Sequence, residues 1–368
     1  MKVLQVLPAL ESGGVERGTL EIADALVREG HDSHVASAGG RLVADLEAAG
    51  SKHHTWHLGD KTPTILFQIR PFRQWLESEQ FDIVHVRSRL PAWITHWALK
   101  RLPASSRPHF ITTVHGLNSV SRYSGILTRG ERVIAVSRTC QQYVLDNYPD
   151  TPAEKLRVIP RGIDPDYWRR DYQPSSTWLD GWHHEFPGLA GRFIVTLPGR
   201  LSRLKGHEDF LEIVERLRAE IPDIVALIVG GAAPGKERYE RELRTMCRQR
   251  HLDGTVVFTG PRQDIRDIYA ISDVVLSLSN KPESFGRTVL EPLAMGTPVV
   301  GYNRGGVGEI LEALFPEGAV PPADTEAAAN SVLSIRAGRT MEVRTNHQFL
   351  LQTMQEQTLA LYREVMAS

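Results

Sequence analysis

The sequence has almost no cysteine and no long apolar run. Cys140 and Cys247 are its two cysteines, and they lie far apart in the 368-residue chain. Two isolated cysteines provide neither a disulfide framework nor a paired zinc-binding motif, and such sparse use is typical of a reducing compartment. No stretch approaches the about 18 consecutive apolar residues of a membrane-spanning helix, and Glu11 interrupts the short apolar start. We therefore expect neither a transmembrane helix nor a signal peptide.

An excess of charge of either sign is also absent. The formal net charge is −1, which excludes a whole-surface attraction for polyanions, so we expect no nucleic acid partner. The composition is 41% hydrophobic and 24% charged, as in ordinary globular proteins. The length indicates two domains or one large one, and there is enough apolar material for two cores.

Short apolar segments alternate with helical patterns along the first half of the chain. The segment KVLQVLP predicts a buried strand, and GGVERGTLEIADALVREG predicts a helix that ends at Gly30. Further strands are predicted from SHVASAGG, FDIVHVRS, HFITTVHG and RVIAVS. Apolar strands that are buried on both faces and separated by helices favour a parallel sheet.

The pattern breaks at residues 171–191, which are rich in proline, glycine, serine and aromatic residues. We interpret this stretch as the connection between two domains. The pattern then restarts, with strands predicted from RFIVTLPGR, IVALIVGG, TVVFTG, DVVLSLS and TPVVGY. The prediction is an α/β fold with a first domain at 1–175, a second at 176–345, and a helical segment at 346–368 that crosses back to the first domain.

The stretch PESFGRTVLEPLAMG combines two acids with a predicted helix start. Glu283 and Glu291 lie eight positions apart, and a helix is predicted to begin near Gly286. The first N–H groups of a helix have no intrahelical partner and favour an anion. The carboxylates would accept hydrogen bonds from paired hydroxyls, such as those of a sugar and a ribose. We expect Pro292 to kink this helix, because it cannot donate to the preceding turn.

Two more loops carry charge at predicted strand ends. GRLSRLKG follows a strand and contains Arg200 and Lys205, two cations that could neutralise a diphosphate without a metal. NRGGVGEI follows another strand, with glycine-rich backbone and Glu309. In open α/β sheets, ligands bind at the carboxyl ends of the strands, so these loops are candidates for a binding site.

Together these motifs resemble those of the retaining glycosyltransferases of family four. Pro-Glu-Ser-Phe-Gly followed by Glu291 resembles the E-x7-E signature of that family, GRLSRLKG resembles its arginine and lysine loop, and GGVGE resembles its glycine-rich donor loop. In the first domain, SGGVER resembles the family's first loop, and TVHG carries its usual histidine. The resemblance covers essentially the whole chain and implies the GT-B fold, in which two Rossmann-like, doubly wound domains face a central cleft.

The resemblance implies a role for each matching residue. It assigns catalysis to His115, Arg200, Lys205 and Glu283. It assigns donor binding to seven further residues, namely Gly13, Gly14, Gly286, Arg287, Thr288, Glu291 and Glu309. In this scheme the cations hold the donor diphosphate, Glu283 contacts the transferred sugar, and Glu291 binds the ribose.

The implied reaction moves a sugar from a nucleoside diphosphate sugar, and a UDP-sugar is the family's commonest donor. The cations and the helix start would stabilise the leaving anion where its charge develops. Retention requires either two displacements or attack from the face of the leaving group. The resemblance favours same-face attack, in which the donor phosphate takes the acceptor proton. We expect no cofactor and no metal.

The acceptor side is predicted from a local excess of positive charge. Residues 61–138 contain 12 Lys and Arg against 4 Asp and Glu, and RSRLPAWITHWALKR interleaves basic residues with Trp93 and Trp97. This mixture suits an anionic lipid surface or a phosphorylated acceptor, with Arg87 and Arg89 as candidate acceptor-binding residues. The alternative is that the two tryptophans form one packed helix face. The resemblance to enzymes of lipopolysaccharide core assembly implies a glycan or lipid-linked acceptor and a cytoplasmic protein in peripheral contact with the inner membrane.

Other functions remain as alternatives to transfer. A nucleotide-sugar epimerase with the GT-B fold would need no second acceptor, but the E-x7-E pair and the cationic loop favour transfer. A phosphorylase-like enzyme would need a lysine placed for pyridoxal phosphate, and no lysine is placed persuasively. A nicotinamide dehydrogenase is disfavoured because LPALESGGVERG lacks the G-x-G-x-x-G spacing. A binding protein without activity would not need charged loops in both halves of the chain.

Overall fold

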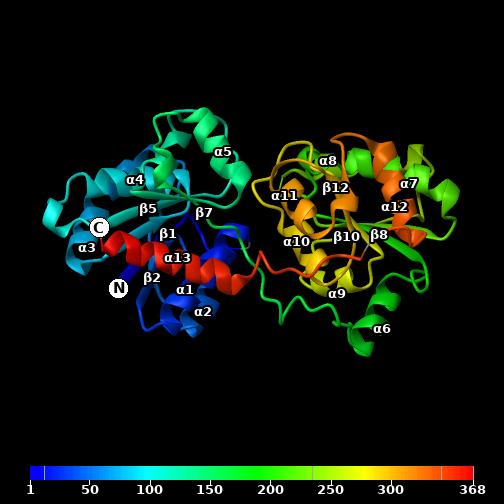
Figure 1. Cartoon of the computed structure of the whole chain (residues 1–368), viewed down its shortest axis with the longest axis horizontal. Coiled ribbons are helices and arrows are strands. Elements are labelled where there is room, and N and C mark those ends of the chain that lie inside the picture. The colour runs from blue at the N-terminus through cyan, green and yellow to red at the C-terminus, as the bar shows by residue number, and fades with distance from the viewer. Residues whose placement is uncertain (12, 234, 341, 368) are drawn as a thin grey trace. The chain divides into compact units, whose positions relative to one another are not determined.

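A computed structural model describes residues 1–11, 13–233, 235–340 and 342–367 (Figure 1). Ser12, which belongs to the SGGVER stretch, lies outside the described residues. The chain forms two compact units. Unit 1 comprises residues 1–162 and 351–368, and unit 2 comprises residues 163–350. Each unit is built around its own parallel β-sheet, so the predicted α/β class is confirmed.

Unit 1 contains a seven-stranded sheet in the order β3-β2-β1-β4-β5-β6-β7, and all its neighbouring strands are parallel. The bounds are β1 Lys2–Val6, β2 Asp32–Ser37, β3 Lys52–Thr55, β4 Ile83–Val86, β5 His109–Val114, β6 Arg132–Ala135 and β7 Leu156–Val158. The central strands are apolar and buried, as expected where helices cover both faces of a parallel sheet.

Helices and short 3-10 turns connect these strands. The α-helices are α1 Gly14–Arg28, α2 Val43–Ala48, α3 Ile69–Glu79, α4 Arg89–Leu99, α5 Arg138–Asn147 and α13 Leu351–Met366. The 3-10 helices are η1 Pro63–Gln68, η2 Ala104–Ser106, η3 Ser124–Thr128 and η4 Ala153–Lys155. The predicted alternation of strands and helices is therefore confirmed for this unit.

Helix α13 joins unit 1 although it lies at the far end of the sequence. It runs along α1 (Figure 1), and Met354 and Tyr362 share a buried core with Ile22. The side-chain amide of Gln355 also donates to the main-chain oxygen of Glu21 at 2.7 Å. The helix begins at Leu351, and residues 346–350 lie outside any helix.

Unit 2 contains a six-stranded parallel sheet in the order β10-β9-β8-β11-β12-β13. Its strands are β8 Phe193–Pro198, β9 Ile224–Val229, β10 Val256–Gly260, β11 Val274–Ser277, β12 Val299–Tyr302 and β13 Ala319–Val320. Its α-helices are α6 Ser176–Glu185, α7 His207–Glu220, α8 Glu237–Gln249, α9 Ile265–Ala270, α10 Arg287–Ala294, α11 Gly305–Leu314 and α12 Thr325–Arg336. Two 3-10 helices, η5 Arg203–Lys205 and η6 Pro316–Gly318, complete the unit.

Helix α8 illustrates why the sequence pattern works for most elements. Tyr239, Leu243 and Cys247 recur every four residues, and all three are buried against the sheet. On the outer face, Arg244 pairs with Glu240 at 2.8 Å. An apolar stripe at this spacing defines an amphipathic helix, and an i,i+4 ion pair adds roughly 0.2–0.5 kcal/mol.

The stretch 171–191 is not the plain connection that its composition predicted. It contains helix α6, in which Trp178, Trp182 and Phe186 form an aromatic row, and Trp182 is only 2% exposed. This row packs on the sheet of unit 2, and the burial of three aromatic side chains outweighs the Pro- and Gly-rich flanks. The unit begins earlier, at Ile163, whose N–H donates to Phe349 O at 3.0 Å.

Within the described residues, no helix is both long enough and apolar enough to cross a bilayer.

Candidate active site

Three loops of unit 2 converge at the carboxyl edge of its sheet. They follow the adjacent strands β8, β11 and β12, and parallel neighbours end at the same edge. The close approach of the loops requires glycine. A Cβ on Gly206 (φ 72°) would lie 2.0 Å from Leu278 O, and one on Gly306 would lie 2.4 Å from Phe285 O. The GRLSRLKG, PESFG and NRGG motifs therefore lie together.

An ion pair joins two of these loops. Lys205 Nζ lies 2.7 Å from Glu283 Oε1, and Ser279 Oγ donates to the same oxygen. Burial by itself would raise the pKa of the Glu283 carboxyl, but the charge and hydrogen bond of Lys205, together with the bond from Ser279, hold that pKa below its ordinary value. Glu283 is therefore an anion at neutral pH.

The start of helix α10 is a candidate anion-binding end at this site. It begins at Arg287, directly after Gly286 (φ 130°), which confirms the predicted helix start. The N–H groups of its first turn, which includes Thr288, and the positive end of its dipole favour a phosphate-like group. One turn later, Glu291 is 7% exposed and pairs with Arg287 Nε at 3.1 Å. Pro292 lies inside the helix.

Two further cations belong to these loops. Arg200 is exposed and forms no ion pair with any residue that the structure describes. Arg304 was not predicted; its Nη2 donates to Ser279 O, while its buried Nε has no hydrogen-bond partner in the described parts of the chain. A sequence signal could have identified Arg304, because it follows a strand and directly precedes the glycine pair of NRGG. Glu309, in α11, is half-buried.

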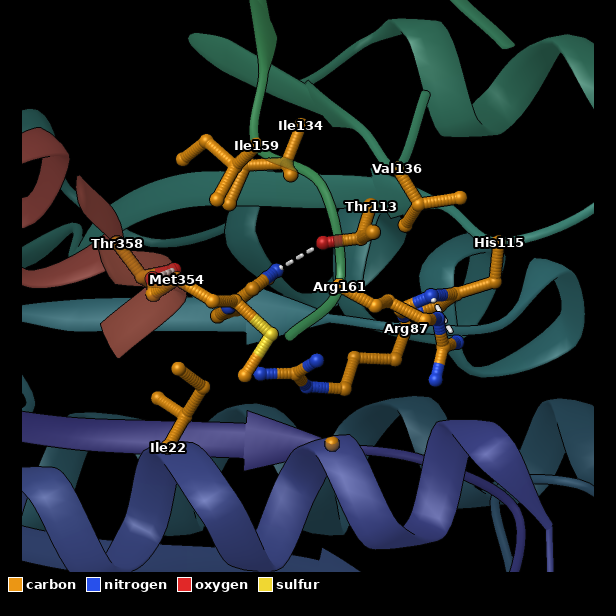
Figure 2. A pocket seen from close by; sticks show the side chains of 12 residues that line it. Ile22, Arg87, Thr113, His115, Ile134, Val136, Ile159, Arg161, Met354 and Thr358 are labelled. Carbon is orange, nitrogen blue, oxygen red and sulfur yellow. Dashed lines mark hydrogen bonds between the residues drawn. The ribbon is translucent and has the colours of Figure 1, made fainter. Parts of the chain in front are cut away.

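Unit 1 has a small cavity of about 30 Å³ near the ends of its own strands (Figure 2). Its polar lining comes from six residues, namely His85, Arg87, Thr113, His115, Arg161 and Thr358. Figure 2 shows the guanidinium groups of Arg87 and Arg161 between helix α1 and the strand end that carries Thr113 and His115. The cavity is therefore strongly cationic on one side.

Arg161 ties two loops that were predicted for the donor site. Its Nη1 donates to Gly14 O, and its Nη2 lies 2.8 Å from His115 Nδ1. A guanidinium can only donate, so Nδ1 accepts and the neutral ring carries its proton on Nε2. Burial, and then the charges of Arg161 and Arg87, hold the pKa of His115 well below its ordinary value. His115 is thus a neutral hydrogen-bond donor through Nε2.

The sequence did not identify Arg161. It follows the short strand β7 in a Pro-Arg-Gly turn, where no periodic pattern marks it. Gly13 is the N-cap of α1 and accepts from Arg17 N at 3.0 Å, and Gly14 is the first residue of that helix. A Cβ on Gly14 would lie 3.0 Å from Arg161 Nη1, so this glycine leaves room for the guanidinium.

The two predicted acceptor-binding arginines have different environments. Arg87 is 6% exposed and donates from Nε to Gln5 Oε1 at 2.9 Å, inside unit 1. Burial lowers its pKa, although the nearby Tyr362 and Glu21 oppose this shift. Arg89 instead donates to Ser124 Oγ at 3.1 Å.

The tryptophans of α4 form a packed pair. The rings of Trp93 and Trp97 lie 5.0 Å apart, and both pack partly buried against the core of unit 1. The packed helix face that was the alternative for these residues is therefore present.

One Asp-x-Asp sequence occurs in the chain, Asp164-Pro165-Asp166. Asp164 Oδ1 accepts from the N–H of Asp166 at 2.9 Å, so this carboxylate closes its own turn. Among the described residues, no three His, Cys, Asp or Glu side chains are grouped closely enough to hold a metal ion.

Comparison with known families identifies the class of protein. The family model described as Glycosyltransferase Family 4 matches residues 12–167, and the model described as Glycosyl transferases group 1 matches residues 183–349. The chain is therefore a glycosyltransferase with the GT-B fold, in which a family 4 domain precedes a group 1 domain.

Individual relatives agree with this assignment. Spore coat protein SA of Bacillus subtilis is 27% identical over 319 residues, which cover 83% of this chain and 80% of that protein. A crystal structure of a glycosyltransferase from Rickettsia africae superposes with a TM-score of 0.81 at 28% identity, over 99% of this chain and 98% of that one. Anabaena Alr3699/HepE in complex with UDP-glucose has a TM-score of 0.81 at 22% identity, over 99% of this chain and 100% of that one, a likeness that shows the fold alone.

These comparisons confirm the predicted fold and the predicted class of enzyme. They do not favour the nucleotide-sugar epimerase that was the main alternative. The roles of individual side chains stay predictions.

Proposed function

We propose that this glycosyltransferase moves a sugar from a nucleoside diphosphate sugar, with uridine as the base, to an anionic glycan or lipid-linked acceptor of the cell envelope, such as lipopolysaccharide. The proposal for the sugar donor rests on the ion pair between Lys205 and Glu283 at 2.7 Å, in loops that also contain the start of α10. A cation, a fixed carboxylate and a helix N-terminus match a diphosphate joined to a hydroxyl-rich sugar.

Each part of the nucleoside diphosphate sugar then has a protein group that binds it. Lys205, Arg200 and the first N–H groups of α10 hold the diphosphate and stabilise the charge that develops when the glycosyl bond breaks. Glu283 accepts from sugar hydroxyls, and Glu291 accepts from the ribose hydroxyls. The HepE complex with UDP-glucose supports uridine as the base, since that protein shares the fold.

The transfer retains the anomeric configuration in this proposal. His115 donates from Nε2 to a sugar hydroxyl and, because its Nδ1 accepts from Arg161, it has no basic nitrogen to offer. The acceptor proton therefore passes to the donor phosphate, and the acceptor attacks from the same face that the phosphate leaves. Neither a metal nor a cofactor takes part, because lysine and arginine supply the positive charge.

The acceptor half includes contact with the cytoplasmic face of the inner membrane. Leu66 and Phe67 of η1 are 52% and 80% exposed, and the nearby Lys61 and Arg70 are exposed cations. Apolar side chains flanked by cations suit insertion between anionic headgroups.

The donor assignment is tested by thermal unfolding without added metal. UDP at 100 times its dissociation constant should stabilise the protein by about 2.7 kcal/mol. Glu291→Ala should lose most of the shift given by UDP, whereas Glu326→Ala, on an exposed turn of α12, should keep it. Absence of any shift with UDP, GDP or ADP compounds would contradict the proposed donor site.

A further inference from the structure

A second and larger hollow opens on the surface of unit 1, and its lining includes none of the residues assigned to the donor site. We call it the lateral hollow. It has a volume of about 930 Å³ and is lined by residues of three segments: the middle of α4, residues 120–129, and residues 147–155. These segments approach one another only in the folded unit, so no sequence motif marks the hollow.

Three cations line the lateral hollow without a carboxylate partner. Arg122 and Arg129 come from the η3 region and Lys155 from η4. None of the three forms an ion pair with any residue that the structure describes, and Asp150, the one acid in the lining, pairs with none of them. The arginines of α8 contrast with this, because Arg244 has its own glutamate neighbour. The hollow therefore keeps an uncompensated positive charge.

Aromatic rings hold part of this charge in place. The Arg129 guanidinium lies 5.5 Å from the centre of the Trp93 ring, a contact that positions the cation without neutralising it. The indole N–H of Trp93 donates to Tyr123 O at 3.0 Å, which fixes the ring. Burial, followed by the charges of Lys100 and Arg129, lowers the pKa of His96 to about 4. His96 therefore lines the hollow as a neutral imidazole.

The opposite wall is also ordered by specific packing. Tyr148 lies against Gly125, where an added Cβ would approach within 3.2 Å of the tyrosine ring. The Tyr148 hydroxyl accepts from Ser121 N at 3.4 Å. Thr128 and Asn147 add a hydroxyl and an amide to the lining. The hollow thus presents cations, aromatic rings and small polar groups on one concave surface.

We propose that the lateral hollow binds an anionic saccharide portion of the acceptor, one that carries phosphate or carboxylate groups. Cations recognise those groups, aromatic rings pack on sugar faces, and hydroxyl and amide groups pair with sugar hydroxyls. A bilayer would fit poorly, because lipid insertion needs protruding apolar side chains rather than a polar concavity. This inference rests on the proposed glycosyl transfer and adds the chemistry and place of acceptor binding.

The test is calorimetric titration of the whole protein with three saccharides. Trigalacturonate supplies carboxylates, a phosphorylated pentamannose supplies phosphate, and maltotriose is the neutral control. At least one anionic saccharide should bind about tenfold or more tightly than maltotriose, equivalent to about 1.4 kcal/mol, and its binding should weaken with salt.

Paired variants locate the binding. Arg129→Ser with Lys155→Ser should weaken the anionic saccharide by tenfold or more, whereas Lys236→Ser with Arg339→Ser, which removes two exposed cations of unit 2, should leave it unchanged. Equal binding of all three saccharides, or equal affinity in both double variants, would overturn the inference. If the first double variant loses its binding to anionic vesicles but keeps its binding to the anionic saccharide, the inference is overturned and the hollow contacts a membrane surface instead.

The UDP shift is measured on the same samples. If UDP still stabilises the protein while no anionic saccharide binds, the lateral hollow fails and the proposed donor chemistry stands. If an anionic saccharide binds through Arg129 and Lys155 but no nucleotide does, the proposed transfer fails and the hollow is a saccharide site in its own right.

Discussion

At the scale of single residues, the motifs predicted the charged groups but not the contacts between them. Glu283 and Lys205 were both expected, yet their 2.7 Å pairing depends on loops that are far apart in the sequence. Ser279 and Arg304 escaped prediction because a lone serine or arginine beside a strand end has many other uses. Local sequence thus gives the chemistry of a site, and tertiary structure decides which groups meet.

Arg161 shows the same limit most clearly, and it makes a direct prediction. Replacing it by Met removes the cation beside His115, so one of the causes that lower the histidine pKa is lost. The pKa of His115 in Arg161→Met should therefore rise toward its ordinary value near 6.5. Imidazole chemical shifts followed by NMR between pH 5 and 8 would measure it.

The lysine variant at the same position is the control. Arg161→Lys keeps the positive charge, so its His115 should stay largely neutral across that pH range. An identical titration of His115 in the wild type and in both variants would contradict the assigned electrostatic role of Arg161.

At the scale of elements, the sequence pattern predicted most buried strands and long helices. The buried strands, such as β9, are short continuous apolar runs, and helices such as α8 carry a clear four-residue pattern. The prediction failed at α6, since its aromatic row lies between proline- and glycine-rich flanks that dominate the local composition. It also gave no sign of η1, because a 3-10 helix of six residues is too short for a periodic signal.

The prediction of membrane contact rests on helix η1. Phe67 is 80% exposed, so replacing it removes little packing and should not lower the melting temperature. Phe67→Ser together with Leu66→Ser should weaken sedimentation with vesicles that contain 30% anionic lipid, because burial of apolar side chains is lost. Sedimentation with neutral vesicles shows how much of the binding depends on the charge of the lipid.

A matched pair of substitutions tests whether η1 is specific. Val120 is another exposed apolar residue of unit 1, at 55%, and Val120→Ser should leave vesicle binding nearly unchanged. If the η1 variant sediments with anionic vesicles as strongly as the wild type, η1 does not contact the membrane.

At the scale of the whole molecule, the α/β class and the repetition of two sheets were predictable, because buried strands alternate with helices throughout. The unit boundaries were harder. Residues 163–175 belong to unit 2 through tertiary contacts such as the buried Trp168 against Tyr269. A boundary set by long-range packing leaves only a weak trace in local composition.

Acid sensitivity is a property of the whole molecule. Burial is the first cause that lowers the pKa of both His96 and His207, in each case to about 4. Their folded-state pKa values lie below the unfolded value of about 6.5, so stability is full above pH 6.5 and is lost as the pH falls toward 4.

The free energy of unfolding should therefore be lower at pH 5 than at pH 7.5 by on the order of 4 kcal/mol, about 2 kcal/mol from each histidine. Urea titrations at several pH values would measure this difference. His207→Asn should reduce the dependence on pH, because one buried histidine no longer titrates. A wild-type stability that is flat between pH 7.5 and 5 would contradict the prediction.

The place of α13 has a consequence for synthesis. Residues 163–350 form a contiguous unit that can fold as soon as they leave the ribosome, whereas residues 1–162 lack their partner helix until residues 351–366 have been made. The side of α1 that receives Met354 and Tyr362 is meanwhile uncovered. Unit 1 therefore begins to emerge before unit 2 but is completed after it, and the nascent chain exposes apolar surface for as long as unit 2 takes to be translated.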